Sequence, residues 1–231
     1  MDYTDLPTPV DGIYSELLLV RDTSSGHEPL SLPAPRADCE VTSEALVGLF
    51  QEHGPPLVMK SDNGSAFKGA QTQGTLLDWK VFSLLSPQAT PQYNGGVEAG
   101  IGTLKIRSDW EAQRNGRAGQ WTSDDVEAAR LISNQTPRRA GQSYVTPLTL
   151  WNSRSPITDH ERSEFARTVD LCRPQALRHY GLSADTELTS KEKDAIDRFA
   201  VSRALVALGY LSFTRRRITP PFKSVFRAKI R

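Results

Sequence analysis

Residues 57–64 read LVMKSDNG, and this stretch decides the fold class. The run LVMKS has the length and apolar character of a buried strand, and Asn63-Gly64 is typical of a tight turn. Asp62 therefore stands at the end of a buried strand. A helix capped by Asp38 and running to about His53 is predicted just before it, ended by Gly54-Pro55-Pro56. A helix leading into a buried strand is typical of α/β folds.

Further strands and helices are expected on both sides of this stretch. Three strands are predicted before it and a helix, a strand and a long helix after it, at residues 1–4, 14–20, 29–32, 70–79, 81–85 and 94–114. Three consecutive strands can form an antiparallel meander, to which helix-linked strands add in parallel by right-handed crossovers. The expected architecture is a mixed five-stranded sheet with helices on both faces.

Later helices are indicated by their capping residues. Starts are predicted at Thr122, at Thr146-Pro147, at Thr158 with Glu161, and at Thr189 with Glu192; the last two fit the capping box. A boundary is expected near residues 152–158. The predicted domains are a core over 1–155 and a helical C-terminal extension with a basic tail over 156–231.

The charge is unevenly distributed along a chain whose net charge is only +1. Residues 1–100 hold 5 Lys/Arg and 13 Asp/Glu, a net −8, whereas residues 101–231 hold 23 and 14, a net +9. An acidic half suits a site that gathers cations, and a basic half suits a polyanion partner or is simply a solvated basic face. Cys39 and Cys172 are expected to be free thiols. No apolar run approaches a membrane span and no signal pattern opens the chain, so the expected location is the cytoplasm.

Three carboxylates stand out by their positions. Asp2 lies in the first expected strand, Asp62 ends another, and Glu98 lies in the first turn of the long helix. Fifty-nine residues separate the first two and thirty-five the last two. The expected topology brings them to the edge of the sheet where α/β folds place ligands. Carboxylates gathered there repel one another unless cations neutralise them, and two Mg²⁺ or Mn²⁺ ions about 3.5–4 Å apart support in-line phosphoryl transfer.

Each of these carboxylates taken alone also has a structural explanation. Asp2 could be an ordinary surface residue near a chain end. Asp62 could form the Asn-Gly turn, and Glu98 could interact favourably with the helix dipole. The spacing by itself leaves both interpretations open.

Five short segments surround or follow these carboxylates: MDYT at 1–4, VRDTSSG at 20–26, SDNGSAF at 61–67, PQYNGGVE at 91–98 and GTLK at 102–105. Together they resemble the integrase catalytic core family, which retroviral integrases share with bacterial insertion-sequence DDE transposases in the RNase H-like superfamily. The resemblance covers roughly residues 1–150, and the thirty-five-residue gap before the glutamate is a hallmark of the family.

The resemblance implies a function as well as a fold. Asp2, Asp62 and Glu98 match the catalytic carboxylates that bind two Mg²⁺ or Mn²⁺ ions, and Asp22 matches an acidic residue that is not a ligand. The implied activity is a DNA transposase or integrase reaction, in which element ends are cut by water and joined to target DNA by a 3′-hydroxyl. The implied partners are DNA ends and target DNA, handled by a homo-oligomer, with a nucleoid-associated location in the cytoplasm.

Five residues are candidates for contacting DNA. Lys105 shares a helix face with Glu98 and Gly102, Asn63 follows Asp62, and the tail carries Arg215, Arg216 and Arg217. Each has a plainer alternative: a solvated lysine, a turn-forming asparagine, and a basic edge strand protected by charge.

Two departures from the family leave alternatives open. Only Met1 precedes Asp2, whereas family members usually carry a DNA-recognising region there, and the first strand lacks its upstream half. The expected alternative is therefore a catalytically inactive, N-terminally truncated transposase remnant that only binds DNA. An RNase H-like nuclease acting on other nucleic acids is a third hypothesis, and the thirty-five-residue spacing argues against it.

Overall fold

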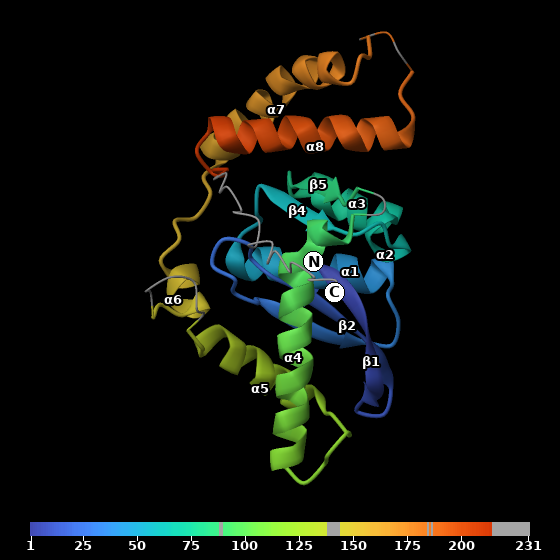
Figure 1. Ribbon diagram of the computed structural model, residues 1–231, viewed down its shortest axis with the longest axis vertical. Helices are drawn as coiled ribbons and strands as arrows, with labels where there is room; N and C mark the ends of the chain where they lie inside the picture. Colours follow the sequence, from blue (N-terminus) through green and yellow to red (C-terminus); the bar gives the residue numbers. More distant parts are fainter. Residues whose placement is uncertain (88–89, 138–143, 184, 186, 214–231) are drawn as a thin grey trace, which may run out of the picture.

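The computed structural model describes residues 1–231 except 88–89, 138–143, 184, 186 and 214–231. It is a mixed α/β fold with helices on both faces of a small sheet (Figure 1). The strands are β1 (Asp2–Val10), β2 (Tyr14–Val20), β3 (Leu30–Ala34), β4 (Val58–Ser61) and β5 (Phe82–Leu85). The helices are α1 (Cys39–His53), α2 (Ser65–Lys68), α3 (Ala70–Asp78), α4 (Gly95–Arg114), α5 (Ser123–Gln135), α6 (Pro147–Asn152), α7 (Asp159–His179) and α8 (Ser190–Ala207), and a 3-10 turn, η1 (Pro91–Asn94), precedes α4.

The first three strands form the expected antiparallel meander. β2 is the central strand and pairs with β1 on one side and β3 on the other. β1 continues to Val10, six residues beyond the expected end, and contains Pro7 and Pro9. Proline is tolerated there because β1 is an edge strand of the meander, and because its pairing with β2 is irregular between Asp5 and Val10.

The strands β4 and β5 form a separate parallel pair, in register from Val58 opposite Phe82 to Ser61 opposite Leu85. The single five-stranded sheet expected from sequence is thus divided, among the described residues, into a three-stranded and a two-stranded sheet. The backbone nitrogen of Met1 donates to the Lys60 carbonyl at 2.7 Å, which brings the start of β1 beside β4. One bond is too few for a ladder, so the two sheets are neighbours and not one sheet.

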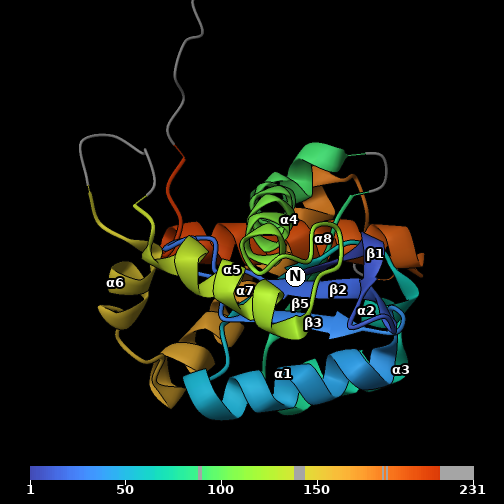
Figure 2. The same cartoon turned by 90° about the horizontal axis from the view of Figure 1, so that it is seen from below.

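Hydrophobic cores on both faces hold the helices to the meander. Side chains of β2 point alternately to each face: Leu18 packs with Leu46 and Phe50 of α1, while Leu19 packs with Leu104 of α4. Figure 2 shows α1 and α3 on one face of the sheet and α4 and α5 on the other. Ile101 and Leu104 are buried in the core between α4 and the meander, which fixes how α4 lies on the sheet.

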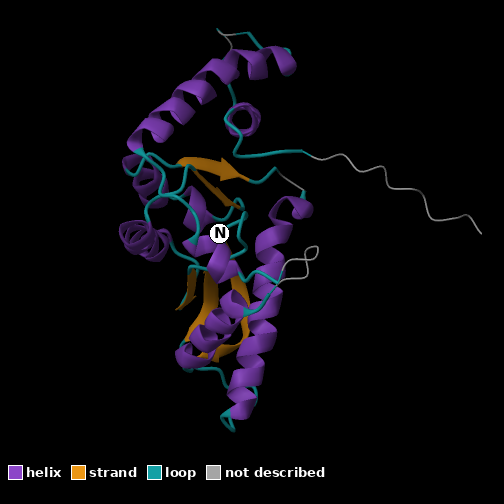
Figure 3. Cartoon of the chain, turned by 90° about the vertical axis from the view of Figure 1, so that its left-hand side faces the viewer, coloured by secondary structure: helices purple, strands orange, loops and turns teal. Residues whose placement is uncertain are grey.

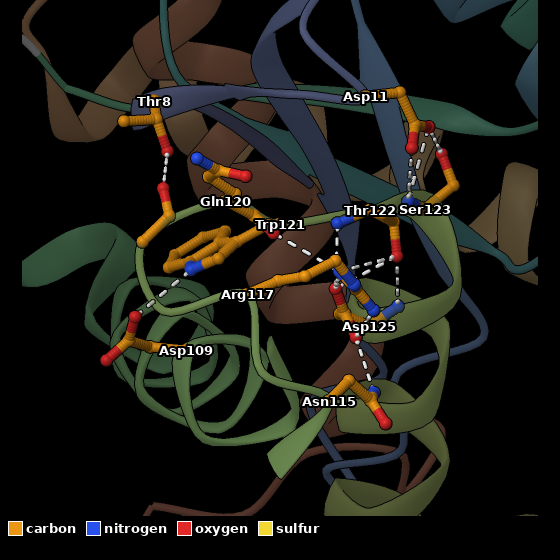
Figure 4. A network of polar contacts seen from close by, with 11 residues as sticks. Thr8, Asp11, Asp109, Asn115, Arg117, Gln120, Trp121, Thr122, Ser123 and Asp125 are labelled. Atoms are coloured by element: carbon orange, nitrogen blue, oxygen red, sulfur yellow. Dashed lines mark hydrogen bonds and ion pairs between the residues drawn. The ribbon is translucent and has the colours of Figure 1, made fainter. Parts of the chain in front are cut away.

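A closed polar network fixes the turn between α4 and α5 (Figure 4). Asp125 accepts hydrogen bonds from Arg117 Nη1 at 2.5 Å, from the Thr122 amide at 2.8 Å and from Asn115 Nδ2 at 3.1 Å. Thr122 and Asp125 also form a capping box at the start of α5. The Asp11 carboxylate accepts from the Ser123 hydroxyl at 2.5 Å, which ties the β1–β2 hairpin to the same turn.

The helices α7 and α8 form a hairpin that packs on β4 and β5, at the far end of the molecule from the α4–α5 turn (Figure 1). Phe165 of α7 is fully buried against Phe82, and Arg162 donates to the carbonyls of Pro55 at 2.7 Å and Pro56 at 2.9 Å. Figure 3 shows the hairpin beside the two-stranded sheet. The boundary between residues 155 and 156 stays a prediction, and the basic tail from residue 214 lies outside the described residues.

Several local predictions have definite outcomes. The capping boxes at Thr158–Glu161 and Thr189–Glu192 are confirmed, and Cys39 and Cys172 are free. The short helix α2 was not expected, because four residues carry no readable periodicity. Among the described residues, no helix combines the length and the hydropathy that crossing a membrane requires.

Candidate functional site

The three predicted carboxylates come from three elements that meet beside the start of β1. Asp2 is the first residue of β1 and is paired with Leu19. Asp62 directly follows β4, and Glu98 lies in the first turn of α4. Asp2 and Asp62 are partly buried, whereas Glu98 is exposed.

The geometry of the Asp62 turn holds this side chain in place. Asp62 Oδ1 accepts a hydrogen bond from the Gly64 amide at 2.9 Å, so the carboxylate shapes the turn, as an Asx turn does. A side chain at position 64 would bring its Cβ within 3.1 Å of Asp62 Oδ1, which explains the small residue there. Asn63 Nδ2 donates to the Ser86 carbonyl at 2.7 Å and thereby joins the ends of β4 and β5. Asp62 therefore has one oxygen committed to the turn and one that no described hydrogen bond uses.

The charges of the other two carboxylates act on Asp2. Burial raises the pKa of Asp2 to about 6, and repulsion from Asp62 and, more weakly, from Glu98 adds to the rise. The amino group of Met1 acts in the opposite direction. A carboxyl whose pKa is raised by other carboxyls lies in a site that a cation would stabilise.

The donor set fits a hard divalent cation by its chemistry. Carboxylate oxygens are the ligands that Mg²⁺ and Mn²⁺ prefer, with water and substrate phosphate filling the remaining positions. Within the described part of the chain, no group of three His, Cys, Asp or Glu side chains is gathered tightly enough to hold a metal ion. The carboxylates are thus within electrostatic reach of one another without forming a closed coordination shell.

An acidic hollow of about 370 Å³ adjoins Asp62. Its lining includes Asp5 and Glu16 besides Asp62, together with Tyr3 and Phe67. Burial and the neighbouring Asp5 raise the pKa of Glu16. This surface would repel a DNA phosphate unless cations neutralised it.

The predicted DNA contacts have other partners in the structure. Lys105 Nζ donates to Thr4 Oγ1 at 2.8 Å and to the Asp5 carbonyl at 2.6 Å, so it joins α4 to β1. Asn63 is held by Ser86, as described above. Arg215, Arg216 and Arg217 lie outside the described residues, so their DNA contact stays a prediction.

Two basic residues that were not predicted as site residues bind backbone carbonyls shortly before Glu98. Lys60 Nζ donates to the Tyr93 carbonyl and lies 3.7 Å from the centre of the Tyr93 ring. Arg21 donates to the Gly96 carbonyl in the first turn of α4. Lys60 could have been noticed in the sequence, because it is a lysine inside the apolar run LVMKS. No residue near Arg21 in the sequence indicates its contact with α4.

A buried ion pair lies under the same helix. Glu28 is fully buried, and its Oε1 lies 4.0 Å from Arg21 Nε. A Cβ at Gly100 would lie 2.9 Å from Arg21 Nη1 and 3.0 Å from Glu28 Oε1, so only glycine lets α4 approach this closely. Burial raises the pKa of Glu28 to about 7, against the opposing charges of Arg21, Arg107 and Arg130.

Retroviral proteins are among the proteins to which this chain is similar. No family model matches the chain. A stretch of 151 residues, 62% of the chain, is 30% identical to part of the Gag-Pol polyprotein of avian reticuloendotheliosis virus. The match spans only 12% of that polyprotein.

Solved structures with a similar fold include three retroviral proteins, each 18% identical to the chain. A chain of the simian T-cell lymphotropic virus intasome, solved with PP2A regulatory subunit B56 gamma, has a TM-score of 0.58 and matches over 68% of this chain and 56% of its own. The HTLV-2 integrase catalytic core, in complex with magnesium and in trimeric form, has a TM-score of 0.51 over 64% and 91%. The BIV integrase catalytic core has a TM-score of 0.50 over 65% and 93%. The chain therefore has the fold of an integrase catalytic core, and its sequence motifs resemble the same family.

Proposed function

We propose that this chain catalyses metal-dependent cleavage and strand transfer of DNA phosphodiesters, as a DDE-type transposase or integrase. The observation that supports the proposal is that Asp62 and Glu98 both act electrostatically on Asp2, on a fold similar to that of an integrase core. A structural role for each residue alone would not require the three charges to interact. The same proposal includes DNA ends and target DNA as substrates, a homo-oligomer on DNA, and a cytoplasmic, nucleoid-associated location.

Asp2, Asp62 and Glu98 would hold two Mg²⁺ or Mn²⁺ ions. When bound, such ions activate the attacking water or 3′-hydroxyl and stabilise the leaving oxygen. The magnesium in the HTLV-2 catalytic core supports this choice of metal. Asp62 would contribute the oxygen that its turn leaves open, and Glu98 would contribute an exposed side chain. Arg21 and Lys60 would act as positioning residues, since they fix the backbone on either side of Asn94.

A strand-transfer assay with Mg²⁺ and labelled DNA ends tests this proposal. We expect Glu98→Gln to abolish product while leaving the fold intact, because the side chain is exposed. Glu40→Gln is a matched control: Glu40 is also an exposed acid in the first turn of a helix, but on α1. It should react like the wild type.

The outcomes separate the competing hypotheses. Equal product from wild type and Glu98→Gln would remove Glu98 from the catalytic set. DNA binding without product from the wild-type chain in either metal would favour the inactive remnant. Cleavage of RNA–DNA hybrids without strand transfer would favour the nuclease.

A further inference from the structure

A second hollow, of about 240 Å³, lies on the other side of α4 from Lys105 and is shared with the last turn of α5. The two helices lie side by side in both views (Figures 1 and 2). We call this hollow the α4–α5 pocket. Its lining residues are Arg21, Ala99, Thr103, Arg107, Ser133, Thr136 and Pro137.

The pocket carries a net positive charge, because Arg21 and Arg107 share the negative charge of Glu28. Arg21 is paired with Glu28, and the nearby Arg130 is paired with Glu127 at 2.6 Å. Arg107 has no ion pair among the described residues, although its charge acts on Glu28. No acidic side chain is among the described residues that line the pocket.

Two polar atoms in the lining lack a partner. Arg107 Nη1 and Ser133 Oγ are both buried without a hydrogen bond in the described structure. Ser133 is only 3% exposed, and a helical serine normally bonds to the carbonyl one turn earlier when nothing else is available. The threonine hydroxyls of the pocket are already used: Thr103 donates to Ala99 and Thr136 to Ile132. Buried donors are seldom left open in native proteins, so these two atoms indicate a missing acceptor.

The charge and size of the pocket define the acceptor. The C-terminus of α5 contributes about half a negative charge. The positive charges of Arg107 and of the partly compensated Arg21 together outweigh it. The volume is below the ~300–1,000 Å³ of pockets for drug-sized ligands. A small oxyanion with several acceptor oxygens satisfies both conditions, and arginine forms its strongest hydrogen bonds with such groups.

We infer that the α4–α5 pocket binds a phosphate group through Arg107 and Ser133. The group comes either from the DNA backbone or from free phosphate. The DNA source rests on the proposed function, whereas the phosphate site itself does not.

Titration of the full chain with inorganic phosphate, followed by calorimetry or amide chemical shifts, tests the site. We expect saturable binding that Arg107→Gln weakens at least tenfold and Ser133→Ala at least threefold. Arg114→Gln is the control, because Arg114 lies on the same helix but is exposed and paired with Glu111. Since Ser133 Oγ has no partner, Ser133→Ala should melt no lower than wild type without phosphate. Absence of saturable wild-type binding, or equal binding by all four proteins, would overturn the inference.

A second titration with a short DNA duplex identifies the source of the phosphate. Weaker duplex binding by Arg107→Gln but not by Arg114→Gln would assign the pocket to the DNA backbone. Unchanged duplex binding together with lost phosphate binding would assign it to free phosphate and overturn the DNA source. Neither titration requires catalysis, so an inactive chain can still confirm the pocket.

Discussion

The carboxylate site and the α4–α5 turn place buried acids in opposite surroundings. At the turn, burial of Asp125 would raise its pKa, but hydrogen bonds from Arg117, Thr122 and Asn115 outweigh burial and hold that pKa below its usual range. At the site, burial and two other carboxylates raise the pKa of Asp2 to about 6. A buried acid with a complete set of donors stabilises the fold. An acid that faces other acids costs stability, and such an arrangement is typical of functional sites.

The largest expected effect is on catalysis. Asp62→Asn removes one ligand charge, so we expect strand transfer to fall about a thousand-fold, or ~4 kcal/mol in activation free energy. The melting temperature should not fall much, because an asparagine can still accept the Gly64 hydrogen bond that shapes the turn. Parallel measurement of product and melting checks both. Loss of activity only in proportion to loss of folded protein would make Asp62 a structural residue like Asp125.

Removal of the Asp125 carboxylate should lower stability and leave catalysis unchanged in the folded protein. We expect Asp125→Ala to lower the free energy of unfolding by about 2 kcal/mol, because it removes a buried hydrogen-bond acceptor of the partly exposed Arg117 and breaks a capping box. Chemical denaturation measures this change. Asp124→Ala, the exposed neighbour in the first turn of α5, should cost less than about 0.5 kcal/mol. Similar losses for both variants would show that the network contributes no more than the helix dipole.

Divalent metal should distinguish the two regions directly. Mn²⁺ or Mg²⁺ at a hundred times its dissociation constant should stabilise the wild-type chain by about 2.7 kcal/mol, since a ligand that binds only the folded state stabilises it. Asp62→Asn should lose this gain and Asp125→Ala should keep it, starting from a lower melting temperature. Thermal melts with and without metal provide the measurement. An equal shift in the Asp62 variant would place the metal elsewhere.

The smallest effect is a pH dependence with opposite sign in the two regions. Because the pKa of Asp2 is raised to about 6, the folded chain keeps a proton between about pH 4 and 6 that the unfolded chain has lost. Wild-type stability therefore falls as pH rises through that window. Asp2→Asn should gain about 1–2 kcal/mol at pH 7.5 and nothing at pH 3.5.

Asp125→Asn is the counterpart in this experiment. The lowered pKa of Asp125 stabilises the fold above pH 4, and that stability is lost as pH falls through the folded-state value. The variant should thus be less stable than wild type at pH 7.5. Chemical denaturation at pH 3.5 and pH 7.5 measures the stability of both variants. A stability change of the same sign in both variants at pH 7.5 would contradict the comparison.

Most helices and strands could be predicted because their signals are local. The capping boxes, the apolar stripe of Ile101 and Leu104, and the turn after Asp62 depend on residues a few positions apart. The predicted strand length and the predicted single sheet were wrong, because both depend on which strands pair with one another. The extent of β1 depends on its partner β2, and the division of the sheet depends on how few bonds β1 makes with β4.

The candidate site shows the same division. Its three acids could be predicted from residue type, spacing and resemblance. The surroundings could not: Lys105 contacts Thr4 across 101 positions, and Arg21 contacts Gly96 across 75. Long basic side chains can reach many partners, and only the packed neighbours select one.

By itself, the sequence determined which carboxylates were available, the elements that carry them and the family they resemble. Only the tertiary structure decided that their charges meet at Asp2, that Glu28 and Arg21 lie under α4, and that Arg107 and Ser133 face a common hollow. The physical reason is distance. Periodicity and capping act over a few residues, whereas Coulomb interactions and burial depend on which segments fold against one another.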